Sequence, residues 1–254
     1  MLPFGYEPPV WRARRACPSR SIVPNPDSKL LIVSTSRQAT EAFGAATLLG
    51  RSIRRLAYDH RIEARVTVEN GAGLPRIYNQ HISEENRDKI LLFVHDDVWL
   101  DDCFVYERLR DALENFDVVG IAGNTRRVPQ QPGWAFTTAR PFAWDDWQNL
   151  SGVVAHGSRP GGDLYFYGTP PGLACRLLDG AFLAARCSTL LDAGVRFDER
   201  FAFHFYDMDF CRTAEAAKLR MGTWPIAVTH DSDGKFGSAA WQSGYEAYLA
   251  KWTE

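Results

Sequence analysis

Three adjacent polar residues, His95, Asp96 and Asp97, have the chemistry and the setting of a site for a divalent cation. They follow the apolar run 90–94, whose length and composition are typical of a buried strand. In open α/β sheets, ligands bind at the carboxyl ends of the strands. One or two carboxylates at such an end commonly hold Mg²⁺ or Mn²⁺, while substrate phosphates fill the remaining positions. An isolated Asp-Asp pair is nevertheless more often a helix cap beside a solvated carboxylate, so other residues must decide.

Two further polar clusters occur later in the chain. Asp207 and Asp209 lie where we expect a helix, 207–219, to begin, and the helix dipole stabilises carboxylates at that end. Because these two residues are two positions apart on a helix, their side chains point in different directions. One can face a cleft while the other makes a bond that stabilises the fold. His230 ends a predicted strand at 224–229. Taken alone, such a histidine is more often satisfied within a core than bound to a metal.

The composition is that of an ordinary globular protein. Its 254 residues suffice for one large α/β domain or two small ones, and its hydrophobic (45%) and charged (24%) fractions are typical. A formal net charge of -2 provides no overall attraction to nucleic acid or to an anionic membrane. Five cysteines without C-x-x-C spacing argue against a disulfide framework or a zinc site. We therefore expect a cytoplasmic protein with no secretory signal, no transmembrane segment and no nucleic-acid partner.

Strands and helices alternate through the first half of the chain. Apolar runs at 29–35, 64–68 and 90–94 predict strands, with helices between them. This alternation implies right-handed crossovers and a parallel sheet. A G-x-G-x-x-G turn is absent after the first strand, which argues against a dinucleotide site. The other expected elements are a helix from about 36 to 57, a short helix near 75–82, a helix capped by Asp101, strands at 117–122, 177–185 and 224–229, and helices at 188–194, 207–219 and 239–252.

The segment 123–175 loses this periodicity and is rich in Gly, Pro and aromatic residues. A stretch of this length without regular structure is unusual inside a compact domain and is often functional. Two interpretations fit it equally well. It forms either an aromatic wall that binds an acceptor or a surface meander with a small core of its own.

Four motifs in order resemble the inverting family 2 glycosyltransferases, which have the GT-A fold. They are LLIVSTSR at 30–37, FVHDDV at 93–98, FDERFAFHFYDMDFCRTAEAAKLRMG at 197–222 and PIAVTHDSDG at 225–234. The chain departs from the family pattern at two positions. His95 stands at the first Asp of the D-x-D motif, and Tyr206 replaces the usual Glu. The Q-x-x-R-W motif of processive synthases is absent, which favours an enzyme that adds one sugar.

The resemblance implies a metal-dependent glycosyltransferase of polysaccharide biosynthesis. It would move a sugar from a nucleotide-diphosphate donor, with UDP favoured, to a hydroxyl of a glycan or another acceptor. Asp207 would act as the base, and Asp97, His230 and His95 would hold Mn²⁺ or Mg²⁺. The residues that would contact the donor are Ser34, Thr35, Arg37, Glu69, Asp96, Asp179 and Gly180.

The implied fold is a single GT-A-like α/β domain with a mostly parallel, Rossmann-like sheet flanked by helices and an aromatic-rich insertion. We expect an irregular arm at 1–28, the domain at 29–237 and an amphipathic helix at 238–254. Within the domain, 29–122 would bind the nucleotide and 123–237 the acceptor. Two alternatives stay open, a non-catalytic nucleotide-sugar binder and a sugar nucleotidyltransferase, although the glycine-rich phosphate loop of the latter is missing. Peripheral contact with the inner face of a membrane also stays open.

Overall fold

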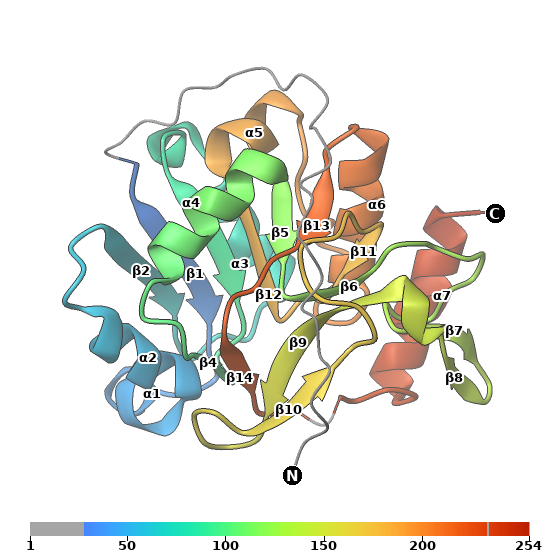
Figure 1. Ribbon diagram of the computed structural model, residues 1–254, viewed down its shortest axis with the longest axis horizontal. Helices are drawn as coiled ribbons and strands as arrows, with labels where there is room; N and C mark the ends of the chain where they lie inside the picture. The colour runs from blue at the N-terminus through green and yellow to red at the C-terminus, as the bar shows by residue number, and fades with distance from the viewer. Residues whose placement is uncertain (1–27, 233, 254) are drawn as a thin grey trace, which may run out of the picture.

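The computed structural model describes residues 28–232 and 234–253, which form a mixed α/β fold built on two six-stranded sheets and a two-stranded hairpin (Figure 1). The prediction of an α/β fold is therefore confirmed. The predicted arm at 1–28 lies outside the described residues except for Ser28. The proposed division of the chain into an arm, two half-domains and a final helix stays a prediction. No helix in the described part of the chain is both long and apolar enough to cross a membrane.

The first sheet is mixed, although three of its five strand pairs are parallel. In spatial order its strands are β13 (Met221–Thr223), β5 (Val118–Gly120), β12 (Phe182–Arg186), β3 (Ile90–Val94), β1 (Leu30–Thr35) and β2 (Ile62–Thr67). The pairs β1–β2, β1–β3 and β5–β13 are parallel, as expected, whereas β12 is antiparallel to both β3 and β5. The reason is that β12 starts beside the carboxyl end of β3, with Phe182 opposite Val94, and must run back along it.

The second sheet lies next to the carboxyl ends of the first. Its strands are β11 (Leu177–Leu178), β6 (Ala122–Asn124), β9 (Leu150–His156), β14 (Val228–His230) and β4 (Val98–Leu100), and β10 (Asp163–Phe166) pairs with β9. The apparently aperiodic segment 123–175 thus supplies β9 and β10, together with the hairpin of β7 (Phe136–Ala139) and β8 (Phe142–Trp144). Glycine interrupts the strand pattern there. At Gly152 (φ 132°), a Cβ atom would lie 2.3 Å from the backbone oxygen of Ile121, which directly precedes β6, so only glycine fits.

Helices cover both faces of the first sheet (Figure 1). They are α1 (Thr40–Ala46), α2 (Leu48–Leu56), α3 (Leu74–His81), α4 (Val105–Asn115), α5 (Cys187–Asp192), α6 (Tyr206–Ala216) and α7 (Ala239–Lys251), with 3-10 turns η1 (Glu84–Asn86) and η2 (Trp147–Asn149).

Two of the predicted helix boundaries are wrong for reasons of capping. The single helix expected up to residue 57 is broken at Thr47, whose extended backbone ends α1 and whose hydroxyl accepts the backbone N–H of Gly50 at the start of α2. Asp101 does not cap α4. Its carboxylate accepts the hydroxyl of Thr229 at 2.6 Å, while Asp102 accepts the N–H of Phe104 just before that helix.

Alternate residues of the central strands face two separate hydrophobic cores. Leu30 and Ile32 of β1 belong to one core, which α2 and α4 cover, and Leu31 and Val33 belong to the other, beneath α3, α5 and α6. Because both faces are buried, these strands are apolar throughout and do not alternate with polar residues. This explains why 30–33 and 90–94 were recognisable in the sequence as buried strands.

A buried carboxylate anchors the C-terminal helix. Asp209 of α6 has no exposed surface, and its Oδ1 accepts the Lys251 ammonium at 2.6 Å and the Trp252 indole N–H at 2.8 Å. Burial raises the pKa of Asp209, and Lys251 opposes that shift by stabilising the charged form. Asp209 is thus the structural member of the Asp207/Asp209 pair, and it fixes α7 against α6.

Removing the cation from this pair should destabilise the fold. We expect Lys251→Met to lower the free energy of unfolding by about 3 kcal/mol, because it leaves a buried carboxylate without its cation. Arg87→Met is the control, since Arg87 pairs with Glu84 and Asp192 at the surface and should cost less than about 1 kcal/mol. Guanidinium chloride unfolding measures both variants, and equal small losses would contradict the anchoring role.

Candidate functional site

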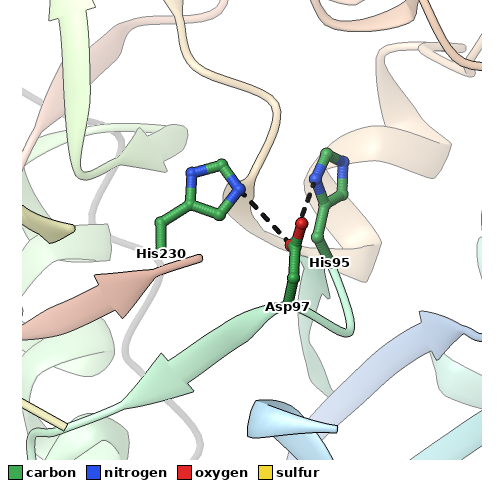
Figure 2. A group of neighbouring side chains, drawn as sticks. All are labelled: His95, Asp97 and His230. Carbon is green, nitrogen blue, oxygen red and sulfur yellow. Dashed lines mark ion pairs between the residues drawn. The ribbon is translucent and has the colours of Figure 1, made fainter. Parts of the chain in front are cut away.

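The three predicted metal ligands lie together at the carboxyl end of β3. His95, Asp97 and His230 each offer one ligand atom, and these three atoms all lie within 4.8 Å of one another. The Nε2 atom of His230 lies 3.3 Å from Oδ1 of Asp97, and Nδ1 of His95 lies 3.9 Å from the same oxygen. Figure 2 shows the two imidazoles on either side of the carboxylate. The structure brings these three residues together, while their binding of a metal stays a prediction.

Strand pairing brings these distant residues to one place. His95 and Asp97 occupy the turn between β3 and β4, and β4 pairs antiparallel with β14 so that Val98 is opposite His230. The backbone oxygen of Asp97 also accepts the N–H of Asp231 at 3.0 Å. The position of His230 beside Asp97 is therefore fixed by the second sheet rather than by flexible side chains.

The atoms that face one another have no other partners. Both Oδ1 of Asp97 and Nε2 of His230 are buried and make no hydrogen bond within the described part of the chain. Leaving buried polar atoms unsatisfied is costly, and native proteins seldom do so without a functional reason. The Asp97 side chain keeps 39% of its surface exposed, so the cluster is open to solvent on one side. Two imidazoles and one carboxylate are a suitable donor set for a divalent transition metal.

Burial and charge act in opposite directions on the three groups. Burial lowers the pKa of His95. Burial also acts to lower the pKa of His230, but attraction to Asp97 outweighs it and leaves that pKa raised. For Asp97, burial acts to raise the pKa, and the two imidazoles reverse that effect, so the carboxyl pKa is lowered. Asp97 is therefore ionised at neutral pH, as a metal ligand must be.

Asp96 points toward the end of β1 and is not part of this cluster. Its Oδ2 accepts the hydroxyl of Ser36 at 2.5 Å, and burial raises its pKa. Ser36 was not among the residues predicted for the site, although it lies between Thr35 and Arg37 in the same motif. The hydrogen bond joins the end of β1 to the turn that carries His95 and Asp97.

The predicted nucleoside-contacting residues lie around the adjoining ends of β1 and β2. Ser34 and Thr35 are buried, and the Thr35 hydroxyl accepts the side-chain N–H of Asn70 at 2.8 Å. The Ser34 hydroxyl is buried with no hydrogen-bond partner in the described residues. Arg37 and Glu69 are exposed, and Glu69 has a left-handed backbone (φ 50°). The structure thus brings buried hydroxyls and exposed charged groups to one edge of the sheet.

Asp179 and Gly180 form the turn between β11 and β12. Asp179 accepts the N–H of Ala181 at 2.8 Å, as expected for a turn, and its other oxygen accepts the indole N–H of Trp134 at 2.9 Å. A Cβ atom at Gly180 would lie 2.7 Å from Cβ of Asp207 and closer still to a neighbouring tyrosine hydroxyl. Glycine is therefore required for the turn to contact the start of α6.

Asp207 lies in the first turn of α6 with its carboxylate against this glycine turn. Its oxygens accept the backbone N–H groups of Gly180 at 3.1 Å and Met208 at 2.9 Å. Burial, and then the nearby charge of Asp179, raise the pKa of Asp207 to about 7, even though the two N–H groups act to lower it. A carboxyl group with a pKa near neutrality is suited to general-base chemistry.

Tyr206 connects Asp207 to the cluster of His95, Asp97 and His230. Its hydroxyl lies 2.6 Å from the backbone oxygen of Gly180 and 2.8 Å from Nε2 of His95. The charge of Asp179 influences the pKa values of Asp207, His95 and His230 alike, so these groups share one electrostatic environment. Sequence reasoning noted Tyr206 only as a departure from a family pattern and missed this contact.

Together the fold and site define a mixed α/β protein with a His₂Asp cluster beside a carboxyl group of raised pKa. No protein-family model matches the sequence, and no curated protein matches it significantly. Among solved structures, the chain is similar to A197 from STIV, with a TM-score of 0.43 and 14% sequence identity over 81% of this chain and 86% of that one. The functional assignment therefore depends on the site residues themselves.

The raised pKa of Asp207 predicts a specific dependence of stability on pH. The folded state holds this proton up to about pH 7, whereas an ordinary Asp releases it near 3.8. The resulting stabilisation is present below pH 4 and is lost as the pH rises through about 7. Between pH 5 and pH 8, wild type should thus lose more unfolding free energy than Asp207→Asn, which has no such proton. Chemical unfolding at both pH values measures this difference, and an equal loss in both proteins would contradict the assigned pKa.

Proposed function

We propose that this protein is a metal-dependent inverting glycosyltransferase with a GT-A-like fold that uses a nucleotide-diphosphate sugar, with UDP favoured, and a hydroxyl acceptor. One observation carries the proposal. Asp97 and His230, with buried and unpartnered ligand atoms, lie beside His95, which Tyr206 joins to the helix turn that carries Asp207. A cation site and a base of suitable pKa are the two parts that such a transfer needs. The motif resemblance in the sequence supports the same assignment.

The side chains that would hold Mn²⁺ or Mg²⁺ are Asp97, His230 and His95. When bound, the ion would neutralise the charge that develops on the departing nucleotide diphosphate. The donor itself would contact the ends of β1 and β2, where exposed charges and buried hydroxyls lie, and also the turn at Asp179 and Gly180. The residues proposed for this contact are Ser34, Thr35, Arg37, Glu69, Asp96, Asp179 and Gly180.

Asp207 would supply the proton transfer. An acceptor hydroxyl donates its proton to the Asp207 carboxylate while its oxygen attacks the anomeric carbon from the face opposite the leaving group. The new carbon–oxygen bond forms as the bond to the nucleotide diphosphate breaks, and the diphosphate oxygen keeps the electron pair. This single displacement inverts the configuration at that carbon. The two backbone N–H groups that hold Asp207 fix its direction, which favours a positioned base over a solvated one.

A non-catalytic nucleotide-sugar binder is the competing hypothesis. The imidazole at position 95 favours it, because that position departs from the D-x-D pattern of the family that the sequence resembles. The retained carboxylate at position 207, with its raised pKa, favours catalysis. Binding without turnover in wild type would select the binder. Release of pyrophosphate in an assay with a nucleoside triphosphate and a sugar phosphate would instead select a sugar nucleotidyltransferase.

Nucleotide binding should depend on the cation. We expect calorimetry to give an affinity for UDP at least about tenfold higher with Mn²⁺ than with EDTA, because an ion held by Asp97, His230 and His95 would offset the negative charge of the diphosphate. Asp97→Asn should remove this difference, since it removes the charged ligand. Asp163→Asn is the matched control, because it makes the same change at an exposed carboxylate on β10. Equal UDP affinity with and without the ion in wild type would exclude the metal role.

Transfer should require the ionised form of Asp207. We expect Asp207→Asn to bind the donor normally but to lose roughly 10²- to 10⁴-fold in transfer rate, the usual contribution of a general base. In wild type the rate should rise about tenfold per pH unit up to about pH 7 and then level off. Mass spectrometry of products, with a panel of nucleotide sugars and acceptors, measures both. Turnover retained in the variant would refute the base assignment.

A further inference from the structure

The hydroxyl of Tyr206 reaches the imidazole of His95 on the side away from Asp97. We propose that Tyr206 is a positioning residue that fixes the tautomer of His95, so that its Nδ1 lone pair faces the cation and the site selects a transition metal such as Mn²⁺ over Mg²⁺. This inference rests on the proposed function of the cluster and assigns His95 as its third, nitrogen ligand.

Hydrogen-bond counting at Tyr206 determines where the His95 proton lies. A tyrosine hydroxyl has one proton to donate, whereas a backbone carbonyl can only accept. At 2.6 Å from the oxygen of Gly180, the Tyr206 proton must point toward that oxygen. The Tyr206 oxygen therefore accepts at its other contact, 2.8 Å away, and Nε2 of His95 is the donor. In a neutral imidazole, a protonated Nε2 leaves the lone pair on Nδ1.

The position of Nδ1 agrees with this role. It lies 3.9 Å from Oδ1 of Asp97, which is too long for a hydrogen bond. Two ligand atoms that each lie about 2.1 Å from one ion can be up to about 4.2 Å apart, so 3.9 Å leaves room for a shared cation. The 3.3 Å separation between Nε2 of His230 and the same oxygen fits as well.

The surroundings of Tyr206 hold its hydroxyl in place. The residue is 2% exposed, and its ring packs against Tyr78 and Phe197. The hydroxyl fits only because Gly180 has no side chain, since a Cβ atom there would lie 2.6 Å from it. Hydrogen bonds to the outer ring nitrogen of a metal-binding histidine orient the ring and typically contribute 10- to 100-fold in metal affinity.

The donor set has a consequence for metal selectivity. Mg²⁺ prefers oxygen ligands and near-ideal octahedral geometry, whereas Mn²⁺, although it also suits oxygen ligands, accepts imidazole nitrogen more readily as a transition metal. With His95 and His230 both presenting nitrogen, Asp97 is the sole oxygen donor of the three. We therefore expect a strong preference for Mn²⁺ over Mg²⁺, and replacement of His95 by a carboxylate should reduce it.

The experiment titrates Mn²⁺ and Mg²⁺ separately into the full chain by calorimetry, with no nucleotide present. Tyr206→Phe should weaken Mn²⁺ binding about 10- to 100-fold, because His95 loses the acceptor that fixes its tautomer. Tyr106→Phe is the matched control. The buried Tyr106 hydroxyl also donates to a backbone oxygen, that of Ser28, but it is not part of this site, so its loss should leave Mn²⁺ affinity unchanged. His95→Asp should lower the ratio of Mn²⁺ to Mg²⁺ affinity at least tenfold.

A second measurement uses only the wild-type protein, so its result cannot be affected by a variant that fails to fold. Long-range ¹H–¹⁵N spectra of the wild-type histidine rings should show His95 protonated at Nε2 and bare at Nδ1. A proton on Nδ1, or unchanged Mn²⁺ affinity in Tyr206→Phe, would overturn this proposal even if sugar transfer is observed. Failure of sugar transfer with the metal results as expected would overturn the proposed function alone.

Discussion

The site depends on the placement of one carboxylate between two imidazoles. Asp97 is held in the turn from β3 to β4, and the pairing of β4 with β14 brings His230 to within 3.3 Å of it. The facing atoms are buried and have no hydrogen-bond partners in the described residues, so their mutual attraction is the main compensation for their desolvation. Such an arrangement stabilises a fold poorly compared with an apolar core. It is well suited to receive a cation.

The reversal of β12 joins this cluster to the candidate base. The chain passes from the second sheet into the first through the turn at Asp179 and Gly180, and α6 packs against that turn. Because Gly180 has no side chain, both Tyr206 and Asp207 contact the turn. The Tyr206 hydroxyl also hydrogen-bonds to His95, and the Asp207 carboxylate accepts the backbone N–H of Gly180. An entirely parallel sheet would not have placed this turn beside the carboxyl end of β3.

The aromatic-rich segment packs against the C-terminal part of the chain and also reaches the site. The rings of Phe136 and Phe142 pack on each other and on Phe236, which lies outside the segment, with centroids 5.1 to 5.7 Å apart. Trp134 from the same segment donates its indole N–H to Asp179. Trp144 and Trp147 are about half exposed. The segment therefore borders the site through Trp134, while its role as an acceptor wall stays a prediction.

The sequence by itself determined the buried strands 30–33 and 90–94, because burial on both faces makes a strand apolar throughout. It also identified His95, Asp97, Asp207 and His230 as polar residues at the ends of strands and helices. The antiparallel β12 and the contact between Tyr206 and His95 were decided by tertiary structure. Periodicity reports which side of an element is buried but not which distant element covers it. Strand direction, tautomer and the pKa of Asp207 depend on those long-range neighbours, so they emerge only when the chain is folded.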